Sequence, residues 1–254
     1  MIFLMGCALT GLAFAKSDTA KVAGERDNLS RNLLQGLEEV IYVPLANHPG
    51  IQLETTIYRP RGPGPFPLVV MNHGKAFNTP AKQARARYPV LSQEFVRRGY
   101  VVVIPMRQGF SHSGGRQLSA GCDLAASARE QAKDVDAVVK HFQKQAWINR
   151  EQVVVMGQSQ GGLVTMAYAE HPASGVKLLV NFAGGLKSTG GRCKTQWAEE
   201  LVLAFERFGT KAQLNSLWFY GQNDSFFDPS LVARMHSAYL DAGRHPKSFA
   251  RLVA

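Results

Sequence analysis

The chain alternates between short apolar runs and longer stretches whose apolar residues recur at helical spacing. The short runs show no alternation with polar residues, so each fits a strand that is covered on both faces. Alternation of such strands with amphipathic helices predicts a parallel sheet wrapped by helices. We expect buried strands at Leu68–Met71, Tyr100–Ile104, Val153–Met156, Leu178–Val180 and Leu217–Tyr220, and helices at Gln83–Arg98, Ala125–Gln145, Gly161–Glu170, Gln196–Phe208 and Pro229–Ala242.

Two further strands are expected before the first buried one. Val40–Pro44 and Leu53–Tyr58 flank a turn of Asn, His, Pro and Gly, and the second run alternates as a half-exposed antiparallel strand does. A last strand is expected at Lys247–Val253. We therefore predict one α/β domain over residues 37–254, with a mostly parallel sheet, helices on both faces and antiparallel N-terminal strands.

The first fifteen residues have the composition of an export signal. Ile2–Ala15 holds no charged side chain and ends in a small-x-small pattern, Ala13-Phe14-Ala15, that signal peptidase accepts. The run is too short to span a bilayer, so no integral membrane span is expected. We predict a signal peptide at residues 1–15, a loose mature N-terminus at 16–36, and a periplasmic or secreted protein. A buried N-terminal segment is the alternative.

Composition excludes few classes of function. Hydrophobic residues make up 45 % of the 254 residues, as in an ordinary globular protein, and the formal net charge is +10. A basic protein can bind nucleic acid, but here Lys and Arg are scattered and no nucleic-acid-reading motif accompanies them, so no nucleic-acid partner is expected.

Cysteine usage suggests one covalent link. Cys7 would leave with the signal peptide, and Cys122 and Cys193 remain as an even pair, which in an exported protein suggests a disulfide. Two unpaired thiols are the alternative, because spacing does not establish that the two residues meet. No Cys and His spacing typical of a metal site occurs, and neither a metal nor a cofactor is expected.

The strongest chemical signal is Gly157-Gln158-Ser159-Gln160-Gly161-Gly162, which lies between an expected strand and an expected helix. A serine in such a sharp turn projects its hydroxyl away from the sheet, and the flanking Gly157 and Gly161 relieve crowding in the strained backbone. The helix N-terminus offers N–H groups to a developing oxyanion. A plain strand–loop–helix connection with a glycine-rich cap is the alternative.

With this context the chain resembles the α/β-hydrolases, most of all the dienelactone hydrolase-like and prolyl-oligopeptidase-like serine esterases and peptidases, over about residues 37–254. The resemblance rests on the Gly157–Gly162 turn, on Asn72-His73-Gly74 and on Gly221-Gln222-Asn223-Asp224. It implies Ser159 as nucleophile, Asp224 as the acid, the backbone N–H groups of Lys75 and Gln160 as oxyanion hole, and His73, Gly74, Gly157 and Gly161 as structural residues at the site.

The candidate acid Asp224 has two competing roles, and a second aspartate, Asp228, lies close to it in the sequence. Asp224 follows the strand at whose end the family's acid stands, but Asn223-Asp224-Ser225 also has the composition of an Asx turn. Asp228 precedes Pro229 and is expected to cap the following helix.

The resemblance places the catalytic base in a loop after the last strand, and the chain ends at Ala254. Only His236 and His245 follow Asp224, and neither is expected at the catalytic edge of the sheet. Three accounts stay open: the chain is truncated, His112 in the Gln108–Gly115 loop substitutes as base, or the protein is non-catalytic. The expected function is cleavage of a small-molecule ester through a serine acyl-enzyme; the alternatives are a hydrolase-fold binding protein and a serine peptidase.

Overall fold

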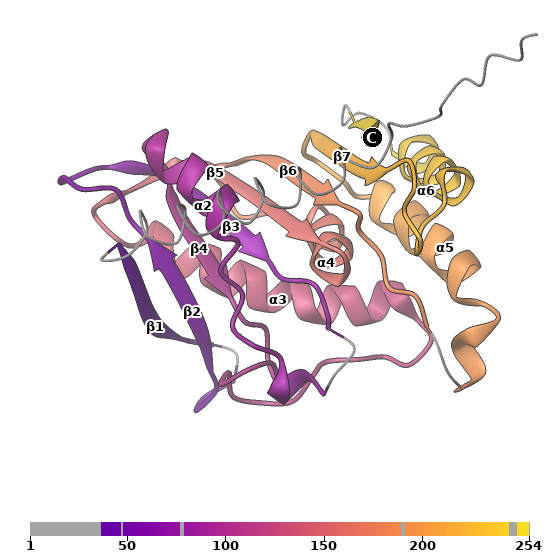
Figure 1. Cartoon of the computed structure of the whole chain (residues 1–254), viewed down its shortest axis with the longest axis horizontal. Helices are drawn as coiled ribbons and strands as arrows, with labels where there is room; N and C mark the ends of the chain where they lie inside the picture. Colours follow the sequence, from indigo (N-terminus) through magenta and orange to yellow (C-terminus); the bar gives the residue numbers. More distant parts are fainter. Residues whose placement is uncertain (1–36, 47, 77–78, 189–190, 244–247, 254) are drawn as a thin grey trace, which may run out of the picture.

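The computed structural model describes residues 37–46, 48–76, 79–188, 191–243 and 248–253. One eight-stranded sheet runs through these residues in the order β1-β2-β4-β3-β5-β6-β7-β8. The described strands thus run from β1 at one edge of the sheet to β8 at the other edge, as the colours of Figure 1 show from indigo to yellow. Both edges are exposed to solvent in part, with Tyr42 on β1 and Phe249 on β8 among the exposed large apolar side chains.

The mostly parallel sheet predicted from the sequence is confirmed. β1 pairs with β2, and β2 with β4, in antiparallel orientation, and every other neighbouring pair is parallel. β4, which shows no polar alternation, is buried on both faces, since all five of its residues are buried. The strands are β1 Glu38–Pro44, β2 Gln52–Tyr58, β3 Phe66–Asn72, β4 Val101–Pro105, β5 Ile148–Gln158, β6 Val176–Phe182, β7 Ser216–Gly221 and β8 Ser248–Val253.

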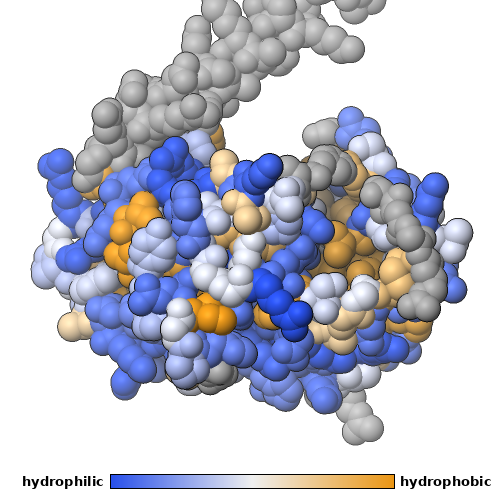
Figure 2. Space-filling model, turned by 90° about the horizontal axis from the view of Figure 1, so that it is seen from below, coloured by the Kyte–Doolittle hydropathy of each residue, from blue (hydrophilic) through white to orange (hydrophobic). Residues whose placement is uncertain are grey.

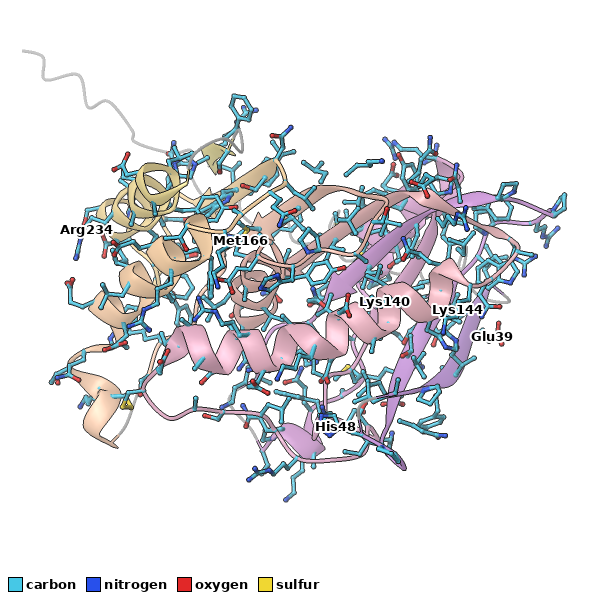
Figure 3. The ribbon with its side chains drawn as sticks, turned by 180° about the vertical axis from the view of Figure 1, so that it is seen from behind. Glu39, His48, Lys140, Lys144, Met166 and Arg234 are labelled. Carbon is cyan, nitrogen blue, oxygen red and sulfur yellow. A yellow bond between two sulfur atoms is a disulfide. The ribbon has the colours of Figure 1, made fainter. Side chains whose placement is uncertain are left out.

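Helices cover the two faces of the sheet unequally. Apolar residues of α3, α4, α5 and α6 form one large core with the sheet, while α2 covers a smaller cluster on the other face through Leu91, Phe95 and Val96. Figure 3 shows the larger side, with α3 crossing in front of the strands and α5 and α6 at one end. The helices are η1 Pro80–Lys82, α2 Pro89–Arg97, α3 Leu124–Gln143, α4 Gln160–Tyr168, η2 Gly191–Lys194, α5 Trp197–Gly209 and α6 Pro229–Ala242.

The helix expected from Gln83 begins six residues later, at Pro89. Proline is favoured in the first turn of a helix and disfavours helical backbone in the residue before it. Tyr88, the residue before this proline, has a left-handed conformation with φ 44°, which separates α2 from the preceding segment. Gln83 and Arg85 are thereby free of the helix, and their side chains reach back to Gly74, in the loop after β3, and to Thr56 on β2.

A disulfide joins Cys122 to Cys193, as expected, across 71 residues of sequence. It links the loop before α3 to the segment between β6 and α5. The expected signal peptide, the loose N-terminus at 16–36 and His245 all lie outside the described residues. Within the described ranges, none of the helices combines the length and apolar character that crossing a membrane requires.

Candidate active site

Ser159 lies at the sharp turn between β5 and α4. Its backbone has φ 54° and ψ −124°, a conformation that a residue with a side chain rarely adopts. Three backbone hydrogen bonds hold it there: the Ser159 N–H donates to Phe182 O at 2.9 Å, and Ser159 O accepts from Leu163 N and Gly185 N, both at 3.1 Å. The side chain stays partly exposed while the helix behind it is buried throughout.

Close backbone contacts explain the glycines around this turn. A Cβ on Gly157 would lie 2.1 Å from Gly161 O, and one on Gly161 would lie 2.2 Å from Asn72 O. Both clashes would be with backbone, which has no means of moving aside locally. A Cβ on Gly74 would lie 3.2 Å from the Ser159 Cβ, so the loop after β3 passes directly beside the serine.

The register of the central strands produces this proximity. β3 and β5 pair in parallel up to Asn72 and Gly157, and both chains then leave the sheet side by side. In the order β5-β6-β7, Asp224 follows the second strand from the one that carries Ser159. The strands β5 and β7 are therefore about 10 Å apart, since neighbouring strands lie about 4.8 Å from each other.

The two candidate oxyanion donors belong to peptide groups whose orientation is fixed. Gly74 O accepts from Gln83 Nε2 at 3.0 Å and lies 2.7 Å from His73 Nδ1. Because a trans peptide points its C=O and N–H in opposite directions, these contacts also set the direction of the Lys75 N–H. The Ser159 carbonyl is held in the same way, and this sets the direction of the Gln160 N–H at the first turn of α4.

His73 is buried, and both of its ring nitrogens face protein groups. Arg107 N–H donates to Nε2 at 3.1 Å, so the proton is on Nδ1, which donates to Gly74 O. Burial and, to a lesser degree, the charge of Arg107 hold the pKa of His73 well below its usual range. The ring is therefore neutral, and it supports the loop after β3 through its contact with Gly74 O.

Sequence reasoning did not single out Arg107, which ties the two sides of the site together. Its guanidinium is fully buried and donates to His73 O at 2.7 Å, to Gln131 Oε1 at 3.0 Å and to Gln160 Oε1 at 3.2 Å. Burial lowers the pKa of Arg107 to about 10, with the charge of Asp134 opposing it, so the group stays cationic at neutral pH. The available signal was an arginine two residues after the end of a buried strand, because buried arginines are rare.

Asp224 forms the Asx-type turn that was one of its two expected roles. Its Oδ1 accepts from Phe226 N at 2.8 Å and from Phe227 N at 3.1 Å. This turn holds the partly exposed carboxylate in one orientation at the end of β7. Because both bonds use one oxygen, the geometry is compatible with the second expected role, in which the other oxygen orients an imidazole.

Ser159 and Asp224 line one cavity of about 400 Å³, together with groups from two other connections, those after β3 and β6. Figure 2 views the molecule from below, where the surface is mostly hydrophilic and hydrophobic groups show in separate patches, most clearly on the right. The described lining contains no histidine. The lining residues are Lys75, Ala76, Gln158, Ser159, Ala183, Leu186, Lys187, Asp224, Phe226 and Phe227.

The structure does not bring His112 together with Ser159. The imidazole is largely exposed and its Nδ1 lies 3.2 Å from Glu54 Oε1 on β2. β2 is three places from β5 in the sheet, about 14 Å away. His236 contacts Ser248 Oγ at 3.0 Å, at the start of β8 and away from the carboxyl ends of the strands.

Solved structures confirm the α/β-hydrolase fold. An esterase from Pyrococcus furiosus matches with a TM-score of 0.60 at 14 % identity, over 84 % of this chain and 80 % of that one. An acylaminoacyl peptidase from Pyrococcus horikoshii matches with a TM-score of 0.64 at 13 % identity, and a dipeptidyl peptidase 4 from Porphyromonas gingivalis with 0.63 at 15 %. Each of these two matches covers 85 % of this chain, but only 36 % and 32 % of the peptidases.

A search of curated protein sequences found no match. The sequence model of the X-Pro dipeptidyl-peptidase (S15) family, in contrast, matches residues 49–224. This range contains both β3 and the Ser159 turn and ends at Asp224. The chain therefore belongs to the X-Pro dipeptidyl-peptidase family, S15.

Proposed function

We propose that this protein is a serine hydrolase that cleaves a small ester through an acyl-enzyme on Ser159. The observation that carries the proposal is the cavity that Ser159, on its strained turn, shares with the Asp224 carboxylate and with Lys75, whose peptide group has a fixed orientation. The family and the fold neighbours are esterases and peptidases, which supports hydrolysis without choosing the bond.

The proposed reaction has two steps. Ser159 Oγ attacks the ester carbonyl carbon and loses its proton to a base, and the Lys75 and Gln160 N–H groups stabilise the oxyanion. The carbon–oxygen bond to the alcohol then breaks, the alcohol leaves with a proton, and water hydrolyses the acyl-serine to release the acid. Asp224 orients the base and stabilises it once it is protonated.

An ester is favoured over a peptide bond by the lining of the cavity. Cleavage of an amide needs a general acid to protonate a strongly basic leaving amine, whereas an activated alkoxide or phenolate leaves with less help. Because the described lining offers no histidine for that task, an ester is the less demanding substrate. The match to a peptidase family makes peptide cleavage the second candidate.

Imidazole rescue tests this function on the 254-residue chain. Hydrolysis of p-nitrophenyl acetate is expected to be weak in plain buffer, because serine without a base is a poor nucleophile. Imidazole is small enough to enter a cavity of about 400 Å³ and should raise the protein-dependent rate at least about tenfold. A fluorophosphonate probe should label Ser159 under the same conditions.

Two variants make the rescue specific. Ser159→Ala, assayed with the same imidazole, measures the background reaction of imidazole with the ester and should show no labelling. Asp224→Ala should lose most of the rescue because the entering imidazole is no longer oriented. If the wild-type chain and Ser159→Ala give equal rates and neither is labelled, the proposed hydrolysis at Ser159 is wrong, and the alternative of a binding protein on a hydrolase fold is favoured. Strong turnover without imidazole would point to a base within the chain, and His112→Ala would then identify or dismiss that residue.

We also propose that the protein is exported. The disulfide between Cys122 and Cys193 supports this, because such bonds persist in oxidising compartments. N-terminal sequencing of the protein recovered outside the cytoplasm should begin at Lys16; a retained Met1 would contradict cleavage at Ala15.

A further inference from the structure

The charge on the wall of the candidate cavity is mainly positive. Lys75 and Lys187 line it, and Asp224 is the one carboxylate in the described lining. The Asp224 carboxylate already accepts two backbone hydrogen bonds, and its proposed role is to orient the catalytic base. In the part of the chain that the structure describes, neither lysine has a carboxylate within ion-pair distance, unlike Lys133 and Lys140 on α3.

The Lys187 ammonium is held at the wall by aromatic rings. Its Nζ lies 5.4 Å from the centroid of Trp197 and 5.8 Å from that of Phe226. These contacts attract the cation to the ring faces without neutralising its charge. Lys187 therefore presents a positive charge at a defined place beside Phe226, which itself lines the cavity.

Apart from Gln158 and the nucleophile Ser159, the rest of the lining is apolar. Ala76, Ala183, Leu186, Phe226 and Phe227 contribute the surface between the charged groups. A ligand that fits this wall combines a short apolar segment with an anionic end. The formal net charge of +10 adds a long-range attraction for anions.

We propose that the ester cleaved at Ser159 carries a carboxylate on its acyl part, as a half-ester of a short dicarboxylic acid does, and that Lys187 with Lys75 binds this carboxylate. The proposal rests on the function proposed above and specifies its substrate class. A peptide with a protonated N-terminal amine would meet like charge at the same wall and is disfavoured.

A pair of esters equal in shape and different in charge tests the proposal. The p-nitrophenyl half-ester of glutaric acid carries the carboxylate, and p-nitrophenyl 5-methylhexanoate replaces that group by an isopropyl group of similar size. With imidazole present, kcat/KM corrected for the Ser159→Ala background should favour the glutarate by about fivefold, as expected for a solvent-accessible ion pair. High salt should reduce the preference because it screens exposed charges.

Lys187→Met removes one of the two charges and keeps an apolar side chain, so the preference should fall below that of the wild type, and Lys75 accounts for what remains. Lys211→Met is the matched control, because Lys211 lines a different hollow with residues of α3 and α4, and the preference should stay as in the wild type. Equal kcat/KM for the two esters in the wild type, or an unchanged preference in Lys187→Met, would overturn the proposal while ester hydrolysis stands. If neither ester is cleaved above the Ser159→Ala background, the hydrolase function itself fails and this proposal fails with it.

Discussion

At the scale of single residues, the site depends on peptide groups that are fixed from behind. Gln83 uses both atoms of its side-chain amide: Nε2 donates to Gly74 O at 3.0 Å, and Oε1 accepts from Ala76 N at 2.8 Å. These two bonds bracket Lys75, whose N–H is a proposed oxyanion donor. Gln83 is thus a positioning residue that acts through the backbone of the loop after β3.

Replacing Gln83 by Ala should lower kcat of the imidazole-supported reaction about tenfold, less than the loss of a whole oxyanion donor. KM should change little, because the donor acts mainly on the transition state. The melting temperature should stay close to that of the wild type, since the side chain is only half-buried. Gln213→Ala, at an exposed position before β7, is the matched control. A proportional rise in KM with unchanged kcat would contradict a positioning role.

At the scale of elements, strand register and helix caps place the functional groups. The parallel pairing of β3 with β5, of β5 with β6 and of β6 with β7 brings four strand ends to one edge of the sheet. α6 then begins at Pro229, five residues after Asp224, capped by Asp228 as expected. The Asp228 carboxylate accepts from Ser230 N at 3.0 Å and Leu231 N at 3.1 Å.

Asp228→Ala should lower the melting temperature by about 2 to 4 °C at neutral pH, the usual effect of losing a helix cap in a domain of this size. Hydrogen bonds from Ser230 and Leu231 hold the pKa of Asp228 below its usual range. A lowered carboxyl pKa stabilises the fold above the unfolded value, about 3.9, and this contribution is lost as pH falls through the folded value. The difference between variant and wild type should therefore shrink below about pH 4, measured by thermal unfolding across pH. A difference that grows on acidification would contradict the cap assignment.

At the scale of the whole molecule, one covalent bond connects the sheet's larger helical layer to the wall of the cavity. Cys122 lies beside the start of α3, and Cys193 lies in η2, between Lys187 and α5. In the sequence, the loop that the bond closes contains α3, β5, α4 and β6, and therefore the Ser159 turn between β5 and α4. Its constraint on the unfolded chain is large because the enclosed loop is long.

Replacing Cys122 and Cys193 together by Ser should destabilise the protein by roughly 4 kcal/mol, as the chain-entropy estimate gives for a closed loop of 71 residues. The melting temperature should fall by about 10 °C. A reductant should lower the melting temperature of the wild type and leave the double variant unaffected. Equal melting temperatures of the two proteins under oxidising conditions would show that the bond does not constrain the unfolded chain as expected.

Much of the fold could be predicted because its signals are local. Apolar runs located all five central strands, since burial on both faces leaves no place for polar residues, although β5 begins at Ile148, ahead of its apolar run. The start of α2 was misplaced because helical spacing continues through Gln83–Tyr88 in the sequence, while Pro89 and the contacts of Gln83 and Arg85 hold that segment outside the helix.

The sequence by itself determined the alternation of strands and helices, the serine turn with its obligatory glycines, and the cap of α6, because each depends on residues within one turn of the chain. The tertiary structure alone decided which distant groups meet. Sheet order placed Asp224 in the cavity of Ser159 and held His112 at β2, three strands from β5. It also buried Arg107 between His73 and Gln160. Such contacts join residues far apart in the chain. Their geometry follows from the order and register of the strands, which cannot be predicted from the sequence pattern of a single segment.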